Sequence, residues 1–192
     1  MIIGITGRVG SGKSTAVQVI QSRFECEVID LDTIGHQLLE DPLVKEELIA
    51  AFGDDILGNE GHIKRSQLSQ LVFSDPEQMK RLNQIIHPPL RATAIQAITA
   101  ANETAALIIV VGALIAELSL ASYCDTIICI DADDSQIQAQ IGPKFDHIAP
   151  FQRSRDGYRQ GAGQTIINTF DTDFENEVVT TIKNLMTDPK SA

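Results

Sequence analysis

The chain has 192 residues, of which 43% are hydrophobic and 21% are charged, as in an ordinary globular protein that folds as one compact domain. Its 15 basic and 26 acidic residues give a net charge of −11, which argues against a function that depends on long-range attraction to nucleic acid or to an anionic membrane. No apolar stretch reaches the roughly 18 residues that a membrane span requires. With this net charge, an anionic substrate would have to be held by local basic groups. We expect the protein to be a monomer or a weak homo-oligomer.

The first residues and the cysteines allow a prediction of where in the cell the protein is found. The chain opens directly into an apolar run with no basic segment before it, so we expect no signal peptide. The three cysteines, Cys26, Cys124 and Cys129, are an odd number and lack C-x-x-C spacing. They predict reduced thiols in a cytoplasmic protein and argue against a disulfide framework or a metal site.

The first predicted element is a buried strand over residues 2–6, because this run is apolar and rich in β-branched side chains. It leads directly into Gly7-Arg8-Val9-Gly10-Ser11-Gly12-Lys13-Ser14, which satisfies the pattern G-x-x-x-x-G-K-[ST]. A helix follows, with Ala16, Val19 and Ile20 on one face. A strand, a glycine-rich turn and a helix in this order form the context that a phosphate-binding loop requires.

The residue types of this loop predict a nucleotide site. Glycines let the turn curl so that successive backbone N–H groups point inward, and the helix N-terminus adds partial positive charge. Lys13 can then reach the β- and γ-phosphates of ATP, and the Ser14 hydroxyl can ligate Mg²⁺. The alternative is a glycine-rich turn that carries a surface lysine. The predicted nucleotide contacts are Gly7, Gly10, Ser11, Gly12, Lys13, Ser14 and Thr15.

Four further apolar runs, at residues 26–30, 105–111, 126–130 and 165–168, predict strands. Their continuous apolarity indicates parallel strands that are covered on both faces by helices. Helical patterns separate them, so we predict right-handed crossovers and a three-layer α/β fold of the P-loop NTPase type with a five-stranded parallel sheet. The last helix should begin near Asp171-Thr172 and bury one stripe, formed by Phe174, Val178, Val179, Ile182 and Leu185.

About seventy residues separate the second and third predicted strands, far more than one crossover helix needs. Helix signals fill the interval, at residues 33–39, 42–52, 66–73, 75–86 and 89–101. Asp75 is expected to cap one of these helices, Pro88 to end it, and Pro89 to begin the next. We therefore predict an inserted helical lobe over residues 33–104 that holds a second substrate. The tail from Thr187 is expected to fray.

Asp30 and Asp32 follow the second predicted strand. Ligands of open parallel sheets collect beyond the carboxyl ends of the strands, so both carboxylates should lie near the phosphate loop. They suit proton acceptance from an attacking hydroxyl and a place in a Mg²⁺ shell. The alternative for Asp32 is an N-cap on the helix that opens at Thr33.

Two histidines are further candidates in the predicted lobe. His36 falls one turn after Asp32 on the same helical face, where it can orient a substrate or serve a structural role. His87 precedes the proline pair, and its residue pattern alone favours packing or capping at that junction.

Together these motifs resemble those of the dephospho-coenzyme A kinase family over almost the full length of the chain. The resemblance rests on the loop at 7–15, Val28-Ile29-Asp30-Leu31-Asp32 with His36, residues 61–68 with Val72-Phe73, Leu82-Asn83 with His87-Pro88, Ala113-Leu114-Ile115, and Ile167-Asn168. The phosphate loop alone is shared by many kinases. The Asp-x-Asp and Leu-Asn…His-Pro motifs make the resemblance more specific.

The resemblance implies transfer of the ATP γ-phosphate to the ribose 3′-hydroxyl of dephospho-CoA, the last step of CoA synthesis. Asp32 would be the base, Lys13 would stabilise charge on the transferring group, and Ser14 with Asp30 would hold Mg²⁺. His36, Arg65 and His87 in the lobe would bind the acceptor. Asn168 would lie near the adenine of ATP, and residues 134–160 would form a lid.

Two positions depart from the family pattern. The third strand usually ends in an acidic residue, whereas this sequence has Val111, with Glu117 nearby. The lid usually supplies arginines, but residues 134–144 have glutamines at the expected positions. The cations that remain in the lid are Lys144, at the end of this stretch, and Arg153, Arg155 and Arg159 beyond it. These departures keep two alternatives open: a nucleotide-binding protein with weak or no kinase activity, and a kinase for another nucleoside or nucleotide.

Overall fold

The computed structural model describes residues 1–58 and 61–187, so the expectation for the C-terminal tail lies outside the described residues except for Thr187. The chain divides into two compact units, one formed by Met1–Asp30 with Ile95–Ala192 and the other by Leu31–Ala94. Among the described residues, no helix combines the length and the apolarity that a membrane crossing needs.

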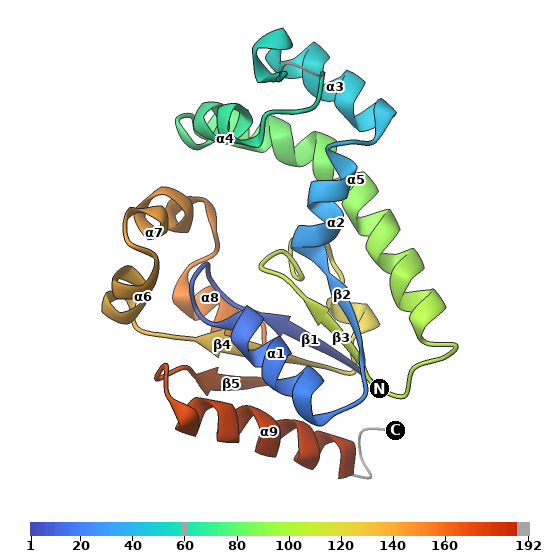
Figure 1. Ribbon diagram of the computed structural model, residues 1–192, viewed down its shortest axis with the longest axis vertical. Helices are drawn as coiled ribbons and strands as arrows, with labels where there is room; N and C mark the ends of the chain where they lie inside the picture. Colours follow the sequence, from blue (N-terminus) through green and yellow to red (C-terminus); the bar gives the residue numbers. More distant parts are fainter. Residues whose placement is uncertain (59–60, 188–192) are drawn as a thin grey trace. The chain divides into compact units, whose positions relative to one another are not determined.

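A five-stranded sheet forms the centre of the first unit (Figure 1). Its strands are β1 (Ile2–Thr6), β2 (Glu27–Asp30), β3 (Ile108–Val111), β4 (Thr126–Asp131) and β5 (Gln164–Ile167). All pairs are parallel and the order is β2-β3-β1-β4-β5, which confirms the predicted parallel sheet. The third strand is shorter than the apolar run 105–111, because its partners β1 and β2 begin at the level of Ile108.

Helices cover both faces of this sheet. Helices α1 (Lys13–Arg23) and α9 (Thr172–Thr187) pack against each other over one face. Ile128 and Ile130 of β4 join their core, whereas Cys129, which alternates to the other face, lies near Tyr158 of α8 (Arg155–Gln160). The three predicted layers are therefore present, with α5 (Pro76–Ala101) contributing its last residues to this unit.

The core between α1, α9 and the sheet follows the predicted apolar pattern closely. Ala16 and Ile20 of α1 are buried, and so are Phe174, Val178 and Ile182 of α9. Val179 and Leu185 of the predicted stripe are half-buried. The Asp171 carboxylate accepts hydrogen bonds from the backbone N–H groups of Asp173 and Phe174, which confirms the predicted N-cap of α9.

Short helices follow β4, in the segment 134–160 that the family resemblance assigns to a lid. They are α6 (Asp134–Ile141), α7 (Pro143–Ile148), the 3-10 turn η3 (Ala149–Phe151) and α8. Between α6 and α7 lies Gly142, whose φ of 56° is in the left-handed region that favours glycine. Another 3-10 turn, η2 (Ala121–Tyr123), precedes β4.

The second unit is helical and has a core of its own. It contains α2 (Leu31–Leu38), α3 (Pro42–Phe52), the 3-10 turn η1 (Asp54–Ile56), α4 (Arg65–Phe73) and the first part of α5. Its buried cluster includes Leu48 and Ile56. This unit, Leu31–Ala94, and the predicted lobe 33–104 differ at their ends, because α5 continues past residue 94 into the first unit.

Helix α5 corrects the prediction that two helices meet at Pro88 and Pro89. Both prolines lie inside one continuous helix. Each lacks the N–H that would bond the carbonyl four residues earlier, a defect that costs about 3 kcal/mol in a helix interior. The φ of proline is nevertheless compatible with a helix, and burial of Leu90 and Ala94 stabilises the turns that follow. The predicted cap at the start of α5 is confirmed, since Asp75 accepts a hydrogen bond from the Glu77 N–H at 2.9 Å.

Candidate active site

The phosphate loop between β1 and α1 adopts a conformation that only glycine tolerates at two of its positions. Gly7 has a φ of 143° and Gly12 a φ of 101°. A Cβ on Gly7 would collide with the carbonyl oxygen of Ile130, and one on Gly12 with the side-chain amide of Asn168. The glycines of the motif are therefore required both by backbone conformation and by close packing.

The start of α1 has the properties of an anion site. Its N-cap, Gly12, has no side chain that could accept a hydrogen bond from the N–H groups of the first turn. Lys13 Nζ donates to the carbonyl oxygens of Gly7 and Arg8, each at 2.9 Å, which holds the ammonium group against the loop. The side-chain oxygen of Ser11 is buried without a hydrogen-bond partner. These donors and the helix dipole suit the phosphates of a nucleotide.

Asn168 supports the loop from the end of β5. Its side chain is buried, and Nδ2 donates to the carbonyl oxygen of Ser11 at 2.9 Å. Its Oδ1 accepts a hydrogen bond from the Phe170 N–H at 2.7 Å. The structure therefore gives Asn168 a role in fixing the phosphate loop. Its predicted position near the adenine of ATP stays a prediction.

Arg8 and Val9 connect the loop to the segment 134–160. The Arg8 guanidinium donates to the Asp134 carboxylate at 2.6 Å and to the carbonyl oxygen of Ala132 at 3.1 Å. It also lies 5.5 Å from the ring centre of Phe145 in α7, within cation–π range. The Val9 N–H donates to Gln152 Oε1 at 2.9 Å. The hydrogen bond from Arg8 lowers the pKa of the Asp134 carboxyl.

Asp131, at the carboxyl end of β4, binds two arginines. Its side chain is only 3% exposed and pairs with Arg155 at 2.9 Å and with Arg159. Arg155 also pairs with the exposed Asp133 at 2.7 Å. Arg155 and Arg159 are four residues apart on α8, so they lie on the same face of that helix and reach one carboxylate together.

The register of the sheet places Asp30 relative to the phosphate loop. Val111 of β3 pairs with Ile5 of β1 on one side and with Asp30 of β2 on the other. Asp30 thus ends a strand at the level where β1 enters the loop, about two strand spacings or ~10 Å away. Val111 occupies the position between them.

Ser14 and Asp30 are chemically suited to hold Mg²⁺ beside bound phosphates. Ser14 is exposed in the first turn of α1, and Asp30 is half-buried at the strand end. Within the described part of the chain, no three His, Cys, Asp or Glu side chains gather into a metal cage.

The remaining predicted site residues belong to the second unit. Asp32 and His36 are exposed on α2, one turn apart. Helix α2 begins at Leu31, so Asp32 lies in its first turn, and the alternative of an N-cap before Thr33 is wrong. Arg65 is exposed at the first residue of α4. The phosphate loop belongs to the other unit, so a pairing of Asp32 with Lys13 stays a prediction.

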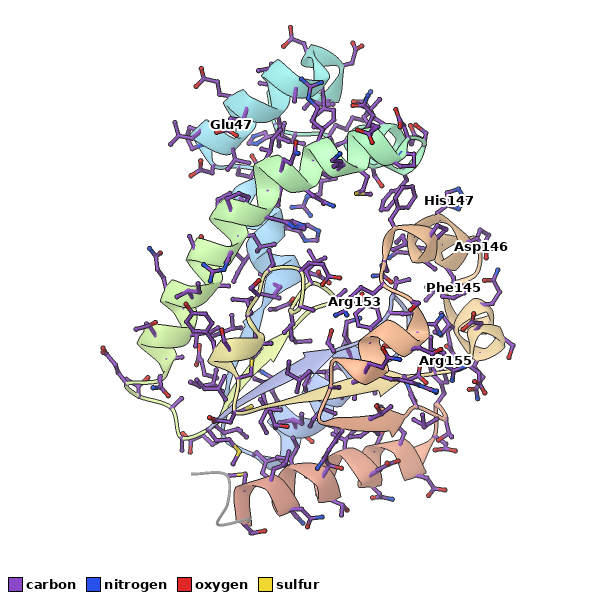
Figure 2. The ribbon with its side chains drawn as sticks, turned by 180° about the vertical axis from the view of Figure 1, so that it is seen from behind. Glu47, Phe145, Asp146, His147, Arg153 and Arg155 are labelled. Atoms are coloured by element: carbon purple, nitrogen blue, oxygen red, sulfur yellow. The ribbon has the colours of Figure 1, made fainter. Side chains whose placement is uncertain are left out.

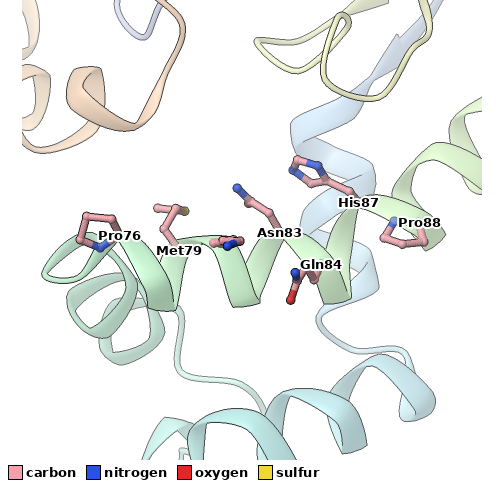
Figure 3. Close-up of a pocket in the computed structure, with 7 residues that line it drawn as sticks. Pro76, Met79, Asn83, Gln84, His87 and Pro88 are labelled. Atoms are coloured by element: carbon pink, nitrogen blue, oxygen red, sulfur yellow. The ribbon is translucent and has the colours of Figure 1, made fainter.

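His87 lines a groove of about 540 Å³ along α5. Met79, Asn83 and His87 point to the same side of the helix, as their spacing of four residues requires (Figure 3). The His87 ring is half-buried, which lowers the pKa of its imidazole, and its Nε2 is buried without a hydrogen-bond partner. The groove thus combines apolar side chains with an amide and one unsatisfied ring nitrogen.

Comparison with known proteins shows to which family the chain belongs. The model of the family described as dephospho-CoA kinase matches residues 1–142. The chain belongs to the dephospho-CoA kinase family. A dephospho-CoA kinase from Borreliella burgdorferi is 33% identical over 148 residues, which are 77% of this chain and 70% of the relative. One from Vibrio vulnificus strain YJ016 is 31% identical over 72% of this chain and 68% of its own length.

Solved structures agree on the fold. TT1252 from Thermus thermophilus has a TM-score of 0.79 at 26% identity, over 98% of both chains. Dephospho-CoA kinase from Campylobacter jejuni has a TM-score of 0.64 at 22% identity, over 96% of both chains. A shikimate kinase from Acinetobacter baumannii has a TM-score of 0.55 at 13% identity, over 97% of this chain and 93% of its own. The last two identities establish a shared fold alone.

Sequence reasoning missed the network that joins the phosphate loop to the segment after β4. The family match ends at residue 142, so Gln152, Arg155 and Arg159 lie beyond it. Asp131 lies just beyond the predicted strand 126–130 and Arg8 is one residue of the phosphate loop, so neither pattern indicates these ion pairs. The available signal was the pair of arginines four residues apart on a predicted helix face, downstream of the three aspartates at 131, 133 and 134.

Proposed function

We propose that this protein transfers the γ-phosphoryl group of ATP to the ribose 3′-hydroxyl of dephospho-CoA, giving CoA and ADP. Family membership supports the reaction. The observation that carries the proposal is the uncapped N-terminus of α1, with Lys13 held over the loop by two carbonyl oxygens. A cytoplasmic location is part of this proposal. Burial raises the pKa of Cys124 and Cys129 to about 11, which keeps both thiols protonated and unreactive.

Each of the predicted site residues would have one task in this reaction. The loop N–H groups and Lys13 bind the phosphates and stabilise the charge that develops on the transferring group. Ser14 and Asp30 hold Mg²⁺, which neutralises part of the phosphate charge when bound. Asp32 accepts the proton of the 3′-hydroxyl as the oxygen attacks phosphorus.

The acceptor site would be built from the helical unit. Arg65 and His36, both exposed, present a guanidinium and an imidazole ring that can hydrogen-bond to an anionic acceptor. The groove beside His87 offers apolar surface and amide groups. A groove that combines apolar and amide groups suits the non-phosphate part of a coenzyme better than it suits an inorganic ion.

A coupled assay of ADP release over several hydroxyl acceptors tests the proposal. Dephospho-CoA should stimulate ATP turnover in a Mg²⁺-dependent way, whereas a nucleoside and a nucleotide should not. Lys13→Ala serves as the matched inactive control. Stimulation by another acceptor in place of dephospho-CoA would show that the substrate assignment is wrong.

A second function is favoured by two observations: Val111 lies where the family has an acidic residue, and residues 134–144 contain no arginine. On these grounds the protein would bind nucleotide with weak or no transferase activity. Tight ATP binding by calorimetry, together with no turnover on any acceptor, would decide for this alternative.

A further inference from the structure

The peptide group between Arg8 and Val9 lies in the phosphate loop, and both of its polar atoms are hydrogen-bonded. Its carbonyl oxygen, that of Arg8, accepts hydrogen bonds from Lys13 Nζ at 2.9 Å and from the Ser11 N–H at 3.2 Å. Its N–H, that of Val9, donates to Gln152 Oε1 at 2.9 Å. One peptide group therefore connects the lysine of the loop to a side chain that lies 143 residues further along the chain than Val9.

The geometry of a peptide group makes these hydrogen bonds depend on each other. The group is planar and trans, so its C=O and its N–H point in opposite directions. It can turn as a unit about the two single bonds that flank it, even when the neighbouring Cα atoms stay in place. Gln152 holds the N–H of Val9 on one side, and the carbonyl oxygen is thereby directed to the other side, toward Lys13.

Other contacts hold this part of the loop without fixing the orientation of that peptide group. The Arg8 guanidinium, at the far end of its side chain, donates to the Asp134 carboxylate at 2.6 Å. Gly10 packs closely against α6, since a Cβ there would lie 2.7 Å from Cγ2 of Ile137. These contacts keep the loop beside α6. The plane of the peptide group between Arg8 and Val9 is set by its own hydrogen bonds.

Gln152 is itself held in place on both sides along the chain. It is half-buried and lies on the stretch that joins α7 to α8, immediately before Arg153 (Figure 2). Its N–H donates to the Ala149 carbonyl oxygen at 3.1 Å, which closes η3. Two residues later, the Ser154 side chain caps α8, and Asp131 ties this helix to the end of β4. The acceptor oxygen is therefore presented by a backbone that is anchored to the same sheet as the loop.

We propose that Gln152 is a positioning residue for Lys13. By orienting the peptide group between Arg8 and Val9, it sets where the ammonium group meets the phosphates of a bound nucleoside triphosphate. Lys13 is held by two carbonyl oxygens, those of Gly7 and Arg8. If the peptide group turned, the flexible lysine side chain would lose the second of these contacts. The proposal rests on the nucleotide site of the proposed function and does not depend on the choice of acceptor.

The test replaces Gln152 with methionine, which keeps an unbranched side chain of similar length and removes the amide group. Gln138→Met is the matched control, because this glutamine lies in the same segment and its Nε2 donates to Asp146 of α7 at 2.9 Å. NMR of ¹⁵N-labelled protein measures hydrogen exchange of the Val9 amide and the chemical shift of Lys13 Nζ. The Lys13 signal is assigned by its absence from Lys13→Ala. Calorimetry measures the affinity for Mg·ATP.

Gln152→Met should accelerate hydrogen exchange of the Val9 amide by about 5–10-fold and change the chemical shift of Lys13 Nζ. It should weaken binding of Mg·ATP by about 3–10-fold, as expected for the loss of one neutral hydrogen bond. Gln138→Met should leave all three measurements unchanged. Gln152→Glu keeps an acceptor oxygen at the end of the side chain, so the Val9 amide should stay protected and the Lys13 signal should stay in place.

Three results would overturn the assignment. Unchanged exchange of the Val9 amide in Gln152→Met would show that this side chain does not hold the peptide group. Faster exchange with an unaltered Lys13 signal and ATP affinity would show that the peptide group does not position the lysine. Equal effects of Gln138→Met would assign the loss to the segment as a whole.

The measurements use no acceptor, so they separate this role from the choice of dephospho-CoA. An unaltered protein that shows all the expected effects but does not phosphorylate dephospho-CoA would contradict the proposed function alone. An unaltered protein that does not bind Mg·ATP would contradict both proposals.

Discussion

Replacing Asp131 with asparagine should destabilise the protein through one buried carboxylate. The side chain lies at the end of β4 and is 3% exposed, and both Arg155 and Arg159 donate to it. Asparagine keeps the shape of the side chain and one acceptor oxygen but removes the negative charge. The backbone carbonyl of residue 131, which accepts a hydrogen bond from the Asn168 N–H at 2.7 Å, is unaffected.

The expected loss can be estimated from the exposure of the partners. Removing one member of a fully buried ion pair costs about 3–5 kcal/mol. Here the arginine side chains are 29% and 38% exposed, so water recovers part of that loss. We therefore expect a decrease of ~2–3 kcal/mol in the free energy of unfolding. For a protein of this size that corresponds to a Tm lower by about 4–12 °C.

Urea denaturation followed by circular dichroism measures this loss, provided that the slope of unfolding free energy against urea stays constant. Asp133→Asn is the matched control, because it removes the same charge from a carboxylate that is 63% exposed and binds Arg155 at 2.7 Å. An exposed pair contributes about 0–1 kcal/mol. Equal destabilisation by the two substitutions would refute the claim that burial makes Asp131 the anchor of α8.

Three further substitutions address the site. Lys13→Ala should lower kcat by about 10²–10³-fold, and a rate close to normal in the ADP-release assay would remove Lys13 from the mechanism. Asp32→Asn should lower kcat by about 10²–10⁴-fold and leave ATP affinity from calorimetry nearly intact, whereas equal loss of both would indicate a role in metal binding or folding. Burial lowers the pKa of the His87 imidazole below its usual 6.5. As the pH falls, this imidazole is therefore protonated in the unfolded chain before it is protonated in the folded protein. The free energy of unfolding should thus decrease as the pH drops through 6.5. Thermal unfolding at several pH values should show this dependence flattened in His87→Gln, and an unchanged profile would contradict it.

The sequence was sufficient to predict the strands, caps and loop that depend only on neighbouring residues. The apolar runs that became β1 and β4 and the caps at Asp75 and Asp171 depend on neighbouring residues, and the structure confirms them. The phosphate loop was recognisable because its glycines are required by backbone conformation at Gly7 and Gly12.

Structural features that depend on residues far away in the sequence could not be predicted from local patterns. The start of β3 is determined by where β1 and β2 begin, not by its own apolar run. The proline pair looked like a helix boundary, yet burial of Leu90 and Ala94 accompanies a continuous α5. The ion pairs of Asp131 join residues 24 and 28 positions apart, and Asn168 reaches back 157 residues to Ser11. Such contacts appear only once the strand order is known.

The charges around the phosphate loop explain how the segment 134–160 is held although residues 134–144 contain no arginine. Arg8, Arg155 and Arg159 face three aspartates, at 131, 133 and 134, so this network is neutral as a whole. Its hydrogen bonds hold α6 and α8 beside the loop without any contribution from a nucleotide. The ion pairs that position the segment therefore do not involve Lys13, the cation that we propose binds phosphate. The ion pairs therefore position the segment although residues 134–144 contain no arginine.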